Sequence, residues 1–308
     1  MADQKRLLII DSNALLHRAF HALPPLATKN GEQTGAVYGF LLTLFKAIKD
    51  LNPGYIVACF DTPAPTFRHK RFKEYKAQRP KTPGEIVTQI PKTKEILEVF
   101  KIPIFAKEGF EADDLIATIA VGSSKKKELS EIYILSGDLD NIQLVNNIVK
   151  VYTLGRGIKD TVIYDEEKVF SRYSIKSSQM IDFKAMVGDS SDNIPGVLGI
   201  GQKTASELLQ KFSNLENIYK EIKNDNPDIK HRIKEILLKY KEQALLAREL
   251  VEMKKDVDMD FNLEQCRFNS FNKKEVESVF SKFEFNSLIN KLPLAGDQSN
   301  ISKQKSLL

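Results

Sequence analysis

Residues 7–11 read LLIID and residues 55–61 read YIVACFD, and each apolar run stops at an aspartate. An unbroken apolar run, without the alternation of a half-exposed strand, is typical of a parallel strand covered on both faces. Helical patterns follow at residues 14–23 and 36–49, and shorter strand-like runs stand at 103–105 and 132–135. We therefore predict an α/β fold with a mostly parallel central sheet and helices on both faces.

Beyond residue 170 the patterns become almost purely helical, at residues 178–187, 203–212, 230–255 and 273–291. We expect residues 1–175 to form an α/β domain with a basic arch at about 66–92. Residues 176–292 are expected to form a helical lobe. Residues 293–308 are polar and lack periodicity, which predicts a disordered tail or a linker.

Composition excludes several classes of protein. The 308 residues are 42% hydrophobic and include two cysteines, Cys59 and Cys266. A disulfide scaffold or a zinc cluster is therefore excluded. No apolar run approaches the roughly 20 residues of a membrane helix. We expect a cytoplasmic, monomeric protein without a membrane partner.

Acidic residues follow the predicted strands or begin the helices beside them. In open parallel sheets the carboxyl ends of the strands meet at the ligand crevice, so acids from separate segments are expected to share one cleft. The acids that follow strands are Asp11, Asp61, Asp138 and Asp140. Further candidates open a helix, at Glu111, Asp113 and Asp114, or stand three residues apart at the entrance to a turn, at Asp189 and Asp192.

Crowded carboxylates raise one another's pKa unless cations compensate them. Oxygen ligands without Cys or His favour Mg²⁺ or Mn²⁺, and two such ions can stabilise both oxygens of an in-line displacement on phosphorus. The pattern indicates metal-dependent phosphodiester hydrolysis. A single aspartate after a strand can equally be a helix N-cap or a turn residue, and the concurrence of several is what favours a site.

A basic tract, TFRHKRFKEYKAQRPK, spans residues 66–81 and holds seven Lys or Arg residues against Glu74 alone. Phe67, Phe72 and Tyr75 are interleaved with these cations. Cations neutralise phosphates and aromatic rings stack on unpaired bases, so the tract suits single-stranded nucleic acid. The alternative is a solvated basic helix whose aromatic residues pack on the protein.

Glycines at 196, 199 and 201 precede a predicted amphipathic helix that contains Lys203. Free backbone N–H groups at such a turn can hold a phosphate, and the helices with their hairpin could grip a duplex without reading its sequence. The turn could also be a helix cap alone. His17 and His21 lack a third metal ligand and are read as a helix face.

These residues resemble a known family, the 5′ nuclease domain at the N-terminus of bacterial DNA polymerase I, related to phage 5′ nucleases and flap endonucleases. The resemblance rests on LLIIDSNALLHRAFHALP (7–24), ACFDTPAPTFRHKRFKEYKAQRP (58–80), GFEADDLIATIA (109–120), SGDLDNIQLV (136–145) and VGDSSDNIPGVLGIGQKTA (187–205). It implies removal of nucleotides or flaps from 5′ ends of DNA, including primer RNA, during replication and repair.

The resemblance also implies roles for individual residues. Asp11, Asp61, Glu111 and Asp113 are similar to ligands of a first metal ion, and Asp138, Asp140 and Asp192 to those of a second. Asp114 and Asp189 match acids that bind through water. Arg18, Lys76 and Arg79 match residues that position the scissile phosphate, and Arg68 and Tyr75 match the arch that encloses the 5′ strand. Gly196, Gly199, Gly201 and Lys203 match a helix-hairpin-helix where relatives bind K⁺.

Two departures and two alternatives remain. Leu139 stands where the family usually has Lys between two aspartates. No polymerase domain follows residue 292, so the chain is either free-standing or the N-terminal part of a larger protein, with a polymerase as partner in trans or in cis. The alternatives are a related metal-dependent ribonuclease and a non-catalytic structure-specific DNA-binding protein.

Overall fold

The computed structural model describes residues 5–155, 160–269 and 271–293, so the predicted tail lies outside the described residues except for residue 293. A six-stranded sheet with the order β3-β2-β1-β4-β5-β6 forms the centre of the molecule. All neighbouring strands pair in parallel except β5 and β6. The mostly parallel sheet is therefore confirmed. The strands are β1 Arg6–Asp11, β2 Tyr55–Cys59, β3 Ile104–Phe105, β4 Glu131–Leu135, β5 Val149–Leu154 and β6 Thr161–Tyr164.

Strand β1 shows why the deciding run is continuously apolar. Leu7 and Ile9 belong to the core cluster on the face of helix α6 (Ala112–Ser123), whereas Leu8 and Ile10 belong to the cluster on the opposite face. All four side chains have no exposed surface. Successive side chains of a strand point to opposite faces, so both faces of the sheet must be covered.

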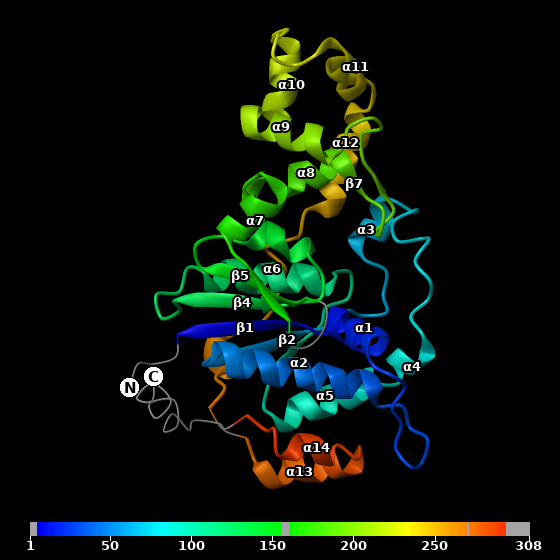
Figure 1. Ribbon diagram of the computed structural model, residues 1–308, viewed down its shortest axis with the longest axis vertical. Coiled ribbons are helices and arrows are strands. Elements are labelled where there is room, and N and C mark those ends of the chain that lie inside the picture. Colours follow the sequence, from blue (N-terminus) through cyan, green and yellow to red (C-terminus); the bar gives the residue numbers. More distant parts are fainter. Residues whose placement is uncertain (1–4, 156–159, 270, 294–308) are drawn as a thin grey trace.

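Helices α1 (Ser12–Ala22), α2 (Gly35–Leu51) and α5 (Ile90–Val99) cover one face of the sheet, and α6 covers the other (Figure 1). The basic tract begins with α3 (Phe67–Arg71) and leads to the short helix α4 (Gly84–Val87). Single turns of 3₁₀ helix lie at η1 (Asp140–Leu144), η2 (Ser177–Gln179) and η3 (Leu263–Cys266).

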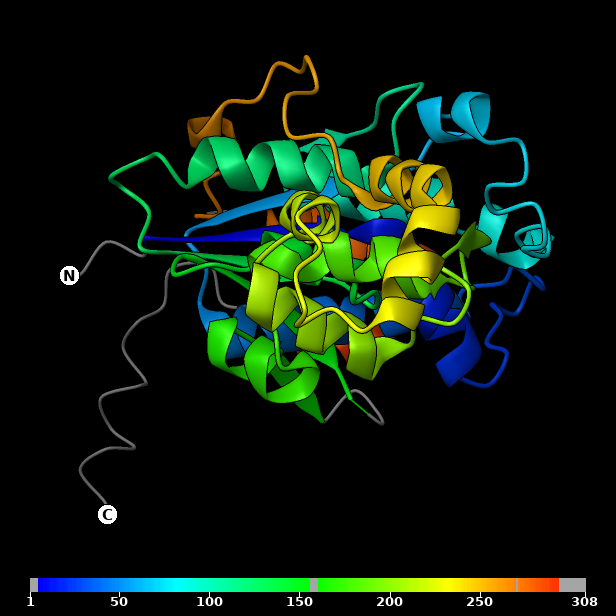
Figure 2. The ribbon, with the colours of Figure 1, turned by 90° about the horizontal axis from the view of Figure 1, so that it is seen from above.

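A helical lobe stands above the sheet, as the views from the side and from above both show (Figures 1 and 2). Its elements are α7 Glu166–Tyr173, α8 Met180–Val187, β7 Gly188–Asp189, β8 Ile194–Pro195, α9 Gln202–Phe212, α10 Leu215–Lys223, α11 His231–Lys239 and α12 Lys241–Val251. The single helix expected at 230–255 is wrong, because Tyr240 leaves the helical conformation (φ −104°, ψ 20°) and caps both α11 and α12.

The last two helices, α13 (Lys273–Lys282) and α14 (Asn286–Ile289), correct the expected extent of the lobe. They lie on the far side of the sheet from it (Figure 1). Phe280 is fully buried there and packs its ring against Phe45 of α2 and against Phe100 beside α5. The apolar outer surface of α2 and α5 needs this cover, since exposing it would leave a large apolar patch in water.

Within the described ranges, no helix has the length and apolar character needed to cross a bilayer.

Candidate active site

Asp11 ends β1 and sits at the centre of the strand edge. One carboxylate oxygen accepts a bond from the Ala14 N–H at 3.1 Å and so caps α1, while the Ser136 hydroxyl donates to the other at 2.6 Å. The side chain is 4% exposed, and this burial raises the pKa of Asp11 to about 7. The helix-cap interpretation is therefore correct for this residue, and its role as a metal ligand stays a prediction.

The beginning of α6 brings three more acids to the same edge. Asp61 accepts a bond from the Ala112 N–H at 2.8 Å, and Glu111 caps the helix. Asp113 accepts from the Asn141 amide at 3.1 Å. Burial, reinforced by the charges of Asp11 and Asp138, raises the pKa of Asp113 well above its usual value. The charges of neighbouring acids thus contribute to the raised pKa values of Asp11, Asp61 and Asp113.

A second group of acids comes from η1 and from the β7–β8 turn. The Lys184 ammonium of α8 pairs with both Asp140 and Asp189, at 2.7 Å from the latter. Burial raises the pKa of Asp140 to about 7 in spite of this partner. For Asp189, burial is outweighed by Lys184 and by bonds from Ser191, which lower its pKa to about 2. No sequence motif singled out Lys184, so sequence reasoning missed it.

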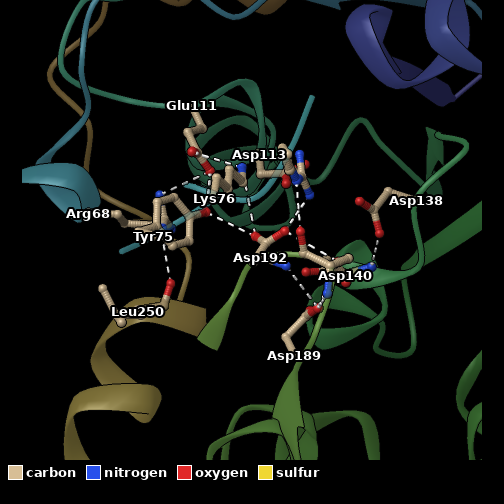
Figure 3. Close-up of polar contacts among 12 residues, drawn as sticks. Arg68, Tyr75, Lys76, Glu111, Asp113, Asp138, Asp140, Asp189, Asp192 and Leu250 are labelled. Atoms are coloured by element: carbon tan, nitrogen blue, oxygen red, sulfur yellow. Dashed lines mark hydrogen bonds and ion pairs between the residues drawn. The ribbon is translucent and has the colours of Figure 1, made fainter. Parts of the chain in front are cut away.

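The basic tract folds down onto these acids (Figure 3). The Lys76 ammonium lies 2.9 Å from Glu111 and 3.7 Å from Asp192, and burial among these acids is outweighed by their charges, so the pKa of Lys76 is raised. Lys76 also has a left-handed backbone (φ 55°), and its N–H donates to the Asp192 carbonyl at 2.9 Å. The Arg79 guanidinium pairs with Asp192 as well.

Two predicted DNA-binding residues of the arch are instead buried. Arg68 is 3% exposed and forms a two-pronged pair with Asp114, at 2.8 and 2.9 Å. Tyr75 is 2% exposed, and its hydroxyl lies 3.0 Å from oxygens of both Glu111 and Asp192. Neither side chain can reach a base, so both assignments are corrected: this part of the tract follows the alternative in which it packs on the protein.

Asp114 requires a correction too. It has no exposed surface, and both of its oxygens are used by Arg68 and by the N–H groups of Glu111 and Lys254. A buried carboxylate must be paired and hydrogen-bonded, and here the protein itself satisfies it. Asp114 is therefore a structural anchor in this arrangement, without a free oxygen for a metal-bound water.

Arg18 of α1 donates to the carbonyls of Leu154 and Gly155 at the end of β5.

Lys203 is exposed at the start of α9. The turn before it is tight: a Cβ at Gly196 would lie 2.3 Å from the Gly188 nitrogen, and Gly199 has a φ of +94°. Both positions therefore require glycine.

The donor set fits a hard divalent cation, since it consists of carboxylates, and burial together with neighbouring acids raises the pKa of Asp11, Asp61, Asp113 and Asp140. In residues 5–155, 160–269 and 271–293 no three acidic, His or Cys side chains converge closely enough to ligate one ion in the present arrangement. Lys76 and Lys184 lie between the acids and give them partial compensation.

The pKa shifts predict how stability without metal depends on pH. Asp11 and Asp140 have folded pKa values of about 7 against an ordinary 3.8, so between these values the folded state binds more protons than the unfolded one. We expect the unfolding temperature in EDTA to fall by several degrees from about pH 5 to about pH 7.5. Asp189, with its lowered pKa, contributes only below this window.

Thermal unfolding with EDTA and with Mg²⁺ or Mn²⁺ measures this effect. Added metal should stabilise more at the higher pH, and Asp11→Asn should flatten the EDTA curve. A temperature in EDTA that rises through the window would contradict the assignment.

The chain resembles several known proteins. The family model "5′-3′ exonuclease, N-terminal resolvase-like domain" matches residues 6–174, and "5′-3′ exonuclease, C-terminal SAM fold" matches residues 175–274. DNA polymerase I of Bacillus subtilis is 38% identical over 100% of this chain and 34% of its own length. The 5′-3′ exonuclease of Aquifex aeolicus is 37% identical over 94% of this chain and 95% of its own. The chain thus spans about a third of the polymerase relatives.

Solved structures share the fold. The T5 D15 protein co-crystallised with metal ions gives a TM-score of 0.65 at 20% identity, covering 93% of this chain and 100% of that one. The catalytic core of Rad2 in complex with DNA substrate gives 0.59 at 16% identity, covering 94% and 93%. With both domain models matched in order, and with a relative matched over nearly all of both chains, the chain belongs to the 5′-3′ exonuclease family.

Proposed function

We propose that this chain is a metal-dependent 5′-3′ exonuclease and 5′ flap endonuclease that hydrolyses phosphodiesters of DNA and of primer RNA. The observation that carries the proposal is the meeting of acids from β1, β2, α6, η1 and the β7–β8 turn with Lys76 and Arg79 at one edge of the sheet. A phosphate needs both parts, cations to hold it and oxygens to hold its metal ions.

We assign two Mg²⁺ or Mn²⁺ ions to the two groups of acids, whose oxygens are the ligands that such ions prefer. The ligands we assign to the first are Asp11, Asp61, Glu111 and Asp113, and those to the second are Asp138, Asp140 and Asp192, with Asp189 through water. When bound, such ions neutralise charge on the phosphate and lower the pKa of a bound water. Lys76 would then be released from Glu111 and Asp192 and could pair with the scissile phosphate, together with Arg79 and Arg18.

We assign the binding of duplex DNA to the helical lobe. The N-terminus of α9 carries exposed Lys203 after the tight turn at 196–201, an arrangement that suits a phosphate backbone and, at its carbonyls, a K⁺ ion. We assign catalysis to residues 1–175 and duplex binding to residues from 176 to the end of α12. The basic arch at 66–92 would lie along the 5′ strand.

The polymerase relatives suggest a setting in replication and repair. We propose that the chain acts as a monomer in the cytoplasm, on nicks, 5′ ends and primer RNA joined to DNA, with a DNA polymerase in cis or in trans.

Cleavage of an end-labelled 5′ flap on nicked duplex DNA tests the proposal. Cuts near the flap junction that require Mg²⁺ and vanish with EDTA are expected, together with short 5′ products from the exonuclease mode. Binding without cleavage would favour the non-catalytic DNA-binding protein, and cleavage of single-stranded RNA alone would favour the ribonuclease.

A further inference from the structure

The segment that leaves the helical lobe, residues 250–257, is fastened to the catalytic domain through its backbone; we call it the exit segment. Each of residues 250–254 forms a hydrogen bond between its backbone carbonyl or N–H group and a side chain of that domain. The bonds run from Arg68 to the carbonyls of Leu250 (2.8 Å) and Glu252 (3.0 Å), from Gln143 to the Val251 carbonyl (3.1 Å), from the Met253 N–H to Gln143 (3.2 Å) and from the Lys254 N–H to Asp114 (2.8 Å).

Arg68 is the centre of this fastening, and Figure 3 shows it beside the Leu250 carbonyl, to which it donates. One guanidinium binds two carbonyls at the end of α12 and both oxygens of Asp114 in the first turn of α6. It also lies 3.6 Å from Glu111. Because Arg68 and Asp114 are buried, water cannot replace these bonds, and the planar fork fixes the angle between the segments it joins.

The other end of α12 reaches the glycine turn. Gln243 donates from α12 to the Gly196 carbonyl, and the Val197 N–H binds the Met186 carbonyl at the end of α8. A continuous path of packed and hydrogen-bonded groups therefore leads from the turn assigned to the duplex, along α12, through Arg68, to the helix that carries Glu111 and Asp113.

Such a path fixes the distance between the turn assigned to the duplex and the acids that are assigned to catalysis. Successive phosphates of one DNA strand advance by about 3.4 Å along the helix axis, so a small displacement of the lobe would present the neighbouring phosphodiester to the acids. We propose that Arg68, Gln143 and Asp114 are positioning residues that determine, through the exit segment, which phosphodiester is cut. This inference rests on the proposed function and names the determinant of its cleavage position.

Product lengths on a 5′ flap with a downstream duplex test the inference, measured in single turnover at nucleotide resolution. Arg68→Lys keeps the charge and loses the fork, and Gln143→Met keeps the length and loses both bonds to the exit segment. Each should spread the cuts over neighbouring phosphodiesters and lower the rate at the original position about tenfold to a hundredfold.

Glu249→Gln is the matched control. Glu249 joins the same two elements, α12 and α3, through an exposed pair with Arg71. Exposed pairs contribute little to the geometry, so the product pattern of this variant should equal that of the unaltered protein.

Product length separates positioning from stability, because a smaller folded fraction slows cleavage without moving the cut. Slower cleavage at an unchanged position in both variants would overturn the inference. If Arg68→Lys does not fold, Gln143→Met decides alone. If the unaltered protein cuts no flap in Mg²⁺ or Mn²⁺, the proposed function fails and this inference falls with it.

Discussion

Replacing Asp138 by asparagine is expected to lower the single-turnover cleavage rate by on the order of 10³-fold, with little change in DNA binding. Asparagine has the same size and can still accept the bond that the Asp140 N–H donates to Asp138 at 2.9 Å. The turn after β4 is therefore kept, and one negative charge of the second group is lost.

Binding in EDTA and cleavage in Mn²⁺ should be measured on the same labelled flap. Asp165→Asn serves as the control, because Asp165 caps α7 in the lobe and asparagine is an equally good cap. A rate within tenfold of the unaltered protein would remove Asp138 from the ligands. Loss of folding would show that its role is structural.

The second large effect is expected for Lys76→Ala, about a hundredfold in the rate on flaps. The Lys76 ammonium is the closest cation to Glu111 and also lies 3.7 Å from Asp192, which Arg79 approaches more closely, so its loss removes a donor for the scissile phosphate. The effect should fall on kcat more than on KM, since a contact strengthened in the transition state affects the chemical step.

Steady-state kinetics at a series of flap substrate concentrations measure kcat and KM separately. Lys49→Ala removes the same charge from an exposed position in the last turn of α2 and should leave both terms unchanged. If Lys76→Ala raises KM alone, Lys76 contributes only to binding. An unaltered rate would end its catalytic assignment.

The sheet and its acidic edge could be predicted because their signals are local. The unbroken apolar runs of β1 and β2 require cover on both faces of the sheet. The run at 7–10 is followed by Asp11, and the run at 55–60 is followed by Asp61. Topology then brings these ends together, without any knowledge of side-chain partners. The acids on α6 follow the same logic, since a helix N-terminus favours negative charge.

Which cations become buried and which face the acids could not be predicted, because this depends on partners that are distant in sequence. Arg68 and Lys76 stand in one tract with similar neighbours, yet Arg68 turns inward to Asp114 and to α12, while Lys76 faces the acids. Lys184 pairs with Asp140, 44 residues away. A charge pattern gives the sign of a segment, and only the fold determines which charges become buried.

The packing of α13 and α14 under the sheet bears on how the chain folds as it is synthesised. The strands and α6 are complete once residue 164 has been made, but the outer surface of α2 and α5 stays uncovered until residues 276–288 leave the ribosome. A nascent chain in between should hold an exposed apolar surface, which is a binding site for chaperones. Proteolysis of nascent chains arrested before residue 273 and after residue 293 would show it, with the shorter chains cleaved faster.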